Sequence, residues 1–133
     1  MNACIIFGEF VRKTRLANRI SGREAADAVG MLPSNFSKLE HGLLNPPRDG
    51  EKQKALADAI GLKNPDERAK FFDFAGEALK AVPADIAEII SEEDALPLLL
   101  RTIGNKRLSK EAIKRLVEIV RGAVSDNISA NTR

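Results

Sequence analysis

The chain has very few of the residues from which metal sites and disulfide frameworks are built. Its 133 residues include one cysteine, Cys4, and one histidine, His41. A lone cysteine excludes an internal disulfide framework, and one cysteine with one histidine is too small a ligand set for a structural zinc site. We therefore expect no metal and no cofactor, and the single thiol fits a reducing cytoplasm.

Long hydrophobic runs are also absent. A membrane-spanning helix needs about eighteen or more consecutive apolar residues, and the sequence has no such run. Its start, MNACIIFGEF, lacks the basic region of a secretory signal. There is no nucleophile–base pattern, no set of metal ligands and no phosphate-binding glycine loop. The sequence thus predicts a cytoplasmic protein that is neither a membrane protein nor an enzyme.

Signals for β-strands are missing, whereas helical spacing recurs along the chain. There is no tryptophan or tyrosine, no sustained apolar–polar alternation and no Asn-Gly or Asp-Gly hairpin turn. Spacing of i, i+3, i+4, i+7 predicts a first helix over about residues 5–18, with the stripe Phe7, Phe10, Val11 and Thr14. The sequence therefore predicts an all-α fold.

Two short helices joined by a tight turn are predicted next. Ser21 suits the N-cap of the first, and Gly30 the turn that ends it. Pro33 suits the first position of the second, which ends near Glu40 before Gly42. This is the layout of a helix-turn-helix, in which the second helix projects its first side chains into the major groove. The expected apolar centre is Ile20, Ala25, Val29, Met31, Phe36 and Leu39.

The following segment predicts two further helices and a boundary. Residues 43–50 form a loop because consecutive prolines cannot lie inside a helix. Helices follow over about residues 50–60 and from Asn64-Pro65, the second with phenylalanines that we expect in the core rather than as a base-stacking platform: Phe71, Phe72 and Phe74. Val82-Pro83 then separates residues 1–81 from an extension, residues 82–133.

The extension predicts three helices. The first covers about residues 84–90, the second opens at Ser91 with Glu92, Glu93 and Asp94 in its first turn, and Ser109 caps the third. Pro97 allows the middle helix to start later. The tail is polar and is expected to be flexible from about residue 125.

Charge is distributed unevenly although the net charge is only +2. Residues 1–63 hold 10 Lys/Arg against 7 Asp/Glu, or +3, and residues 64–133 hold 11 against 12, or −1. The early excess is concentrated in Arg12, Lys13, Arg15, Arg19 and Arg23. A basic bias of this kind is typical of phosphate contact.

The segment from Ile20 to Gly42 resembles the Xre/Cro/C1-type helix-turn-helix regulators. The family's register is kept without a gap at Ile20, Ser21, Gly22, Ala25, Ala26, Gly30, Met31, Leu32, Phe36, Ser37, Leu39, Glu40 and Gly42. The resemblance implies a phage-repressor-like five-helix DNA-binding domain with a C-terminal helical extension. Gly22 replaces a glutamine of the family, Leu32 a small capping residue and Arg19 a common glycine, which weakens caps and contacts rather than the core.

The resemblance also implies which residues meet double-stranded DNA. Residues at the start of the recognition helix are expected at base edges: Ser34, Asn35, Ser37 and Lys38. Phosphate or sugar contacts are expected from Ser21, His41, Asn45 and Arg48, and Arg48 is also able to reach a minor groove. His41 is equally expected to serve only as a cation at a helix end. Arg15 and Glu40 are expected to pair inside the domain.

The function implied by the resemblance is a dimeric repressor that reads a palindromic operator, with the C-terminal helices pairing two subunits. Two alternatives remain. One is an antitoxin that represses its own operon and binds a toxin or other protein through residues 82–124. The other is a protein-interaction module on a helix-turn-helix scaffold that has lost DNA binding, which Gly22 and Leu32 keep open.

Overall fold

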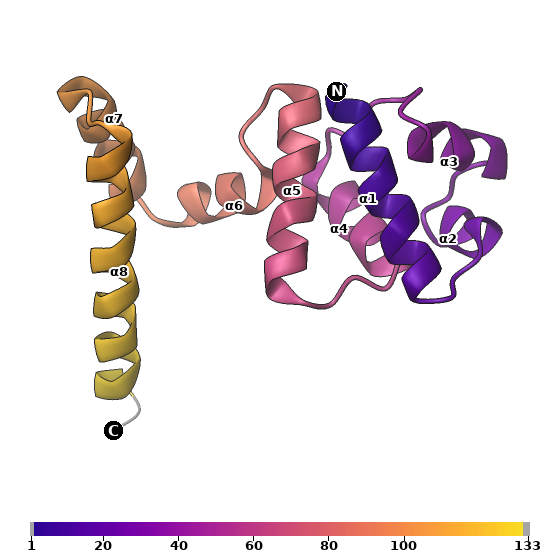
Figure 1. Ribbon diagram of the computed structural model, residues 1–133. Helices are drawn as coiled ribbons and strands as arrows, with labels where there is room; N and C mark the ends of the chain where they lie inside the picture. The colour runs from indigo at the N-terminus through magenta and orange to yellow at the C-terminus, as the bar shows by residue number, and fades with distance from the viewer. Residues whose placement is uncertain (1, 132–133) are drawn as a thin grey trace. The chain divides into compact units, whose positions relative to one another are not determined.

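The structure, a computed structural model, describes residues 2–131, with side chains to residue 122. This part of the chain forms eight helices and no strand (Figure 1). They are α1 (Ala3–Ala17), α2 (Gly22–Ala28), α3 (Pro33–Glu40), α4 (Gly50–Ala59), α5 (Pro65–Leu79), α6 (Ala84–Glu92), α7 (Ala95–Lys106) and α8 (Lys110–Asn131). The predicted all-α fold is confirmed. The chain divides into two compact units, one ending at Glu92 and one beginning at Glu93.

The first unit is organised around α1 and α5, which lie side by side and run in opposite directions (Figure 1). Phe7 and Phe71 are fully buried between them, with ring centroids 5.2 Å apart, and Phe10 meets Phe74 edge-on at 5.5 Å. Burying a side chain of this size stabilises a fold by about 1.5–3 kcal/mol. The prediction that these phenylalanines serve the core is confirmed for Phe71 and Phe72, which are buried in it, and Phe74 is partly buried and packs against it.

Helix boundaries follow the predicted caps. The Ser21 and Asn64 side chains accept hydrogen bonds from the first backbone N–H groups of α2 and α5, and Ser109 does the same for α8. Gly30 and Gly42 follow α2 and α3 with φ of +70° and +76°, a conformation that glycine adopts without a steric penalty. The two short helices and their turn therefore form where the sequence predicted them.

The first unit continues past the expected boundary at Val82-Pro83. Helix α6 packs against α4 and α5, and Lys54 of α4 pairs with Glu88 of α6 at 2.7 Å. The pKa of Lys54 is raised, first by this hydrogen bond and then by the nearby Glu51 and Glu88 charges. The compact unit thus ends at Glu92, whereas the division by role into a DNA-binding domain and an extension stays a prediction.

The sequence predicts Glu92, Glu93 and Asp94 in the first turn of a helix that opens at Ser91, and this prediction is wrong. Glu92 is the last residue of α6, and Asp94 is the N-cap of α7, with no side-chain cap bond. A start at Ala95 puts Pro97 at the third helical position, where proline is tolerated; a start near Ser91 would have put its ring against an upstream carbonyl.

The second unit has no core of its own within the described residues. No side chain of α7 is buried, and none is buried in α8 as far as residue 122. Its most exposed apolar residues are Leu98, Leu99, Leu100, Ile119 and Val120. The backbone of α8 is helical to Asn131. The predicted flexible tail from about residue 125 falls where side chains lie outside the described part.

Candidate nucleic-acid interface

Helix α3 has one buried face and one exposed, polar face. Phe36, Leu39 and Glu40 are buried against the rest of the unit. The outward face is an exposed polar stripe at i, i+3, i+4 and i+7, which we call the α3 stripe: Ser34, Ser37, Lys38 and His41. Asn35 is half-buried at the edge of this face. Three of the four expected base-contacting residues therefore lie fully on the exposed stripe.

An internal ion pair fixes α3 to α1. Arg15 Nε donates to Glu40 Oε2 at 2.7 Å, and Nη2 donates to Oε1 at 2.9 Å, a two-point contact between residues 8% and 7% exposed. Arg15 Nη1 also donates to the Ile20 carbonyl at 2.9 Å. The hydrogen bond to Glu40 raises the pKa of Arg15. The predicted internal pair is confirmed, so Arg15 is engaged inside the domain.

Two glycines let α1 and α3 approach more closely than other residues would allow. A Cβ at Gly8 would lie 2.5 Å from the backbone oxygens of Leu39 and Glu40. A Cβ at Gly42 would lie 2.8 Å from the Cα of Ile5, and Gly42 also has φ of +76°. Sequence reasoning missed Gly8, because a glycine inside a helical pattern does not by itself show which distant backbone comes close to it.

Leu32 and Arg19, two residues that depart from the family pattern, lie in the segments that precede α3 and α2. Leu32 is the N-cap of α3 and, having no side-chain oxygen, makes no cap bond; its side chain is 65% exposed. Arg19 has φ of +58°, the left-handed conformation that favours glycine. Ser21 Oγ accepts from the Glu24 N–H at 3.0 Å, which leaves the hydroxyl hydrogen available to an outside acceptor.

The other expected phosphate contacts follow α3. His41 Nδ1 lies 2.7 Å from the Ser37 carbonyl oxygen, which can only accept, so Nδ1 donates. Asn45 Oδ1 accepts from the Cys4 thiol at 3.1 Å, and the Asn45 amide NH₂ remains a donor. Arg48 is exposed in the loop before α4, and Gln53 Nε2 holds that loop by donating to the Pro47 carbonyl at 2.7 Å.

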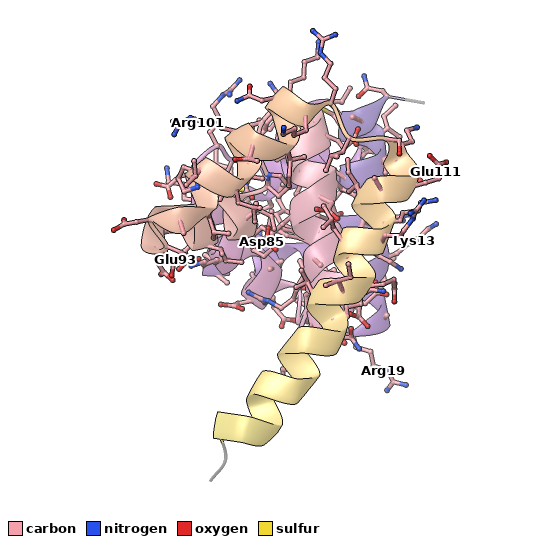
Figure 2. The ribbon with its side chains drawn as sticks, turned by 90° about the vertical axis from the view of Figure 1, so that its left-hand side faces the viewer. Lys13, Arg19, Asp85, Glu93, Arg101 and Glu111 are labelled. Carbon is pink, nitrogen blue, oxygen red and sulfur yellow. The ribbon has the colours of Figure 1, made fainter. Side chains whose placement is uncertain are left out.

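Sequence reasoning did not nominate the apolar residues that flank the α3 stripe. Leu32 precedes α3, and Leu43, 72% exposed, follows it with its N–H bonded to the Lys38 carbonyl at 2.9 Å. A leucine two positions before Ser34 and another two positions after His41 is the signal that was available in the sequence. Away from the stripe, Lys13 and Arg19 project outward from the same unit (Figure 2).

Other kinds of site find little support in the part of the chain that is described. No group of three His, Cys, Asp or Glu side chains there is placed to hold a metal ion. None of the helices searched is both long and apolar enough to cross a bilayer. A cleft of about 410 Å³ lies between α4 and α6, and its lining includes Arg48, Gln53 and Lys54.

Comparison with known proteins identifies the same region. Residues 6–71 match the family described as a helix-turn-helix domain. No curated protein and no solved structure matches the chain. The match runs from α1 through the first half of α5, and it contains the α3 stripe and the Arg15–Glu40 pair. Residues 6–71 of this chain therefore have a helix-turn-helix fold and are similar to that family.

Proposed function

We propose that this protein is a sequence-specific regulator of transcription that binds double-stranded DNA through α3. The α3 stripe carries the proposal, because it is an exposed polar face on the second helix of a helix-turn-helix domain. A major groove admits one helix, and its base edges offer hydrogen-bond acceptors and donors to side chains such as these. The domain family supports binding rather than catalysis.

Each side chain of the interface has a contact suited to its chemistry. Lys38 donates to the acceptors of guanine, and Ser34 and Ser37 bond either class of base. Asn35 is suited to a bidentate bond with adenine, which requires its half-buried amide to reach past the stripe. Register comes from phosphate or sugar contacts by Ser21, His41, Asn45 and Arg48.

The regulator is proposed to be a dimeric repressor of the Xre/Cro/C1 type that works in the cytoplasm. A two-fold pair of domains would place two recognition helices about 34–36 Å apart, which matches a palindromic operator. The support for pairing is the second unit, whose apolar side chains remain uncovered in a single chain as far as the structure describes them. The resemblance supports repression.

Selection of binding sites from random duplex DNA at stated salt tests this function, and Lys38→Ala sharpens it. A base contact by Lys38 predicts a loss of about 1–3 kcal/mol on the selected site and a relaxed preference at one position. Lys63→Ala is the matched control, an exposed lysine in the α4–α5 loop outside the interface. Equal weakening on selected and random DNA would reduce Lys38 to a phosphate contact. Absence of any selected site would remove the proposed function.

An antitoxin is the second candidate, and the same uncovered unit favours it. Residues 82–124 would then bind a toxin or other protein, while α3 represses the operon that encodes both. Copurification of a small protein from the neighbouring gene would support this role. A protein-interaction module without DNA binding is the third candidate, and it is favoured by the missing cap at Leu32 and the glycine at position 22.

A further inference from the structure

The segments on either side of residue 100 carry opposite charges. Residues 81–100 contain five acidic residues and no basic one, for a net charge of −5. Residues 101–122 contain seven basic residues and two acidic ones, for a net charge of +5. We call these the acidic segment and the basic segment. Their charges are equal and opposite, so one chain carries both halves of a complementary pair.

Each segment also presents an uncovered apolar stripe. On α6 in the acidic segment, Ile86 and Ile89 are 42% and 52% exposed and lie three residues apart. On α8 in the basic segment, the stripe has i, i+3, i+4, i+7 spacing and side chains 37–57% exposed: Ile113, Leu116, Val117 and Val120. Surfaces of this kind, apolar with charge beside them, are suited to a helix–helix interface.

Several of the charges have no ionic partner among the side chains that the structure describes. Glu88 is bonded to Lys54, and Glu118 to Arg121. Figure 2 shows Arg101, on α7, and Glu93, in the link between α6 and α7, with their side chains pointing outward. The exposed charges without an ion pair in residues 2–122 include Glu92, Asp94, Lys114 and Arg115. These four are therefore available to an outside partner.

We propose that the occupant of these surfaces is a second copy of this chain, with the acidic segment of each copy against the basic segment of the other. A two-fold interface must be self-complementary. A chain with an acidic and a basic segment meets this condition, because a two-fold pair forms two equivalent contacts, each between the acidic segment of one copy and the basic segment of the other. A foreign partner would need only one of the two surfaces. The inference deepens the proposed function, because such a pairing is what joins the two recognition helices.

Two charge-reversed full-length variants test the pairing. The first carries Glu92→Lys and Asp94→Lys, and the second carries Lys114→Glu and Arg115→Glu. Alone, each variant places like charges together, so its dimer dissociation constant should rise about tenfold or more in analytical ultracentrifugation. Mixed, the two variants restore opposite charges at both contacts, so a mixed dimer should form at the wild-type concentration. That recovery also shows that both variants fold.

Three results would overturn the inference. They are a wild-type chain that is monomeric at micromolar concentration both free and on DNA, variants that each dimerise as the wild type does, or a mixture that fails to recover. In the last case, a single chain that carries all four changes is measured as well. If it dimerises as the wild type does, the acidic and basic segments attract each other within one molecule. Binding of each variant to a half operator is measured in parallel. If the chain binds the half operator but does not pair, only this inference is wrong. If the chain pairs but does not bind the half operator, only the proposed function is wrong.

Discussion

The two units of this chain have similar apolar patterns but very different burial. Thirteen hydrophobic side chains are buried in the unit that ends at Glu92, and none is buried in α7 or in α8 as far as residue 122. Leucine, isoleucine and valine are plentiful in both. An apolar stripe therefore indicates a surface that packs against a partner. Whether the same chain supplies that partner depends on which elements lie next to the stripe.

The strongest test of this difference is to separate the units. A fragment of residues 1–92 contains the whole buried core, so it should unfold cooperatively and keep helical structure. A fragment of residues 93–133 should show no cooperative transition, because it buries too little apolar area to offset the loss of conformational entropy. Circular dichroism during heating measures both. A cooperative transition in the second fragment when monomeric would show that this unit has a core of its own.

Glu40→Ala should damage the first unit most among single substitutions. It leaves the Arg15 guanidinium buried without its partner, for which we expect a loss of about 3–5 kcal/mol in the free energy of unfolding. Glu9→Ala, an exposed acid on α1, is the control and should change little. Urea denaturation checks both variants. An unchanged midpoint for Glu40→Ala, together with lost DNA binding, would assign Glu40 to the DNA interface instead.

A matched pair of glycine substitutions compares the two units directly. Gly8→Ala drives a Cβ into the backbone of α3 and should destabilise the first unit by about 1–3 kcal/mol or more. Gly104→Ala on α7 meets nothing within 4 Å and should favour that helix by up to about 1 kcal/mol. Thermal unfolding gives the first change and helical content the second. A harmless Gly8→Ala would mean that α1 and α3 can separate.

The smallest expected effect concerns the junction of α5 and α6. Partial loss of hydration raises the pKa of Asp73, although its side chain is exposed, and the Asp85 and Glu77 charges raise it further. Because the folded pKa lies above the unfolded one, the stability that this group contributes is complete below about pH 4 and is lost as the pH rises through the folded pKa.

Asp73→Asn should therefore stabilise the protein at pH 7. Because the group is exposed, the gain should be only about a few tenths of a kcal/mol, as for other surface charges. The difference from wild type should vanish near pH 3. Asp58→Asn is the contrasting control, because it removes the 3.0 Å pair with Arg68 and should lower stability slightly. Melting temperatures across this pH range measure both; a gain that persists at pH 3 would contradict the assignment.

Much of the first unit could be predicted because its signals are local. Caps such as Ser21 and Asn64 act within three residues, and the helical spacing of Phe7, Phe10 and Val11 reads directly from the sequence. The close approach at Gly8 could not be predicted, because it depends on residues 31 positions further along the chain. The same holds for α6, which joins the first unit through contacts with α4 that no local pattern specifies.

The candidate site divides in a similar way. The family resemblance implied that Ser34, Ser37 and Lys38 face outward and that Arg15 pairs with Glu40, and the structure has the three side chains exposed and the pair formed. The bond between the Cys4 thiol and Asn45 spans 41 positions and was not foreseen. Asn35 was placed at the base edges by resemblance, whereas the structure leaves it half-buried, so its contact with DNA stays a prediction.

The separation of faces on α3 has a consequence for how such a protein changes over time and for how it can be engineered. Every side chain that anchors the helix points inward, and every member of the α3 stripe is exposed. The four stripe positions can therefore be randomised together with little cost in folding, because surface substitutions usually change stability by less than about 0.5 kcal/mol. Under the proposed function, exchanging these exposed side chains should change the DNA sequence that α3 prefers, while the buried contacts that hold α3 in the domain stay unchanged.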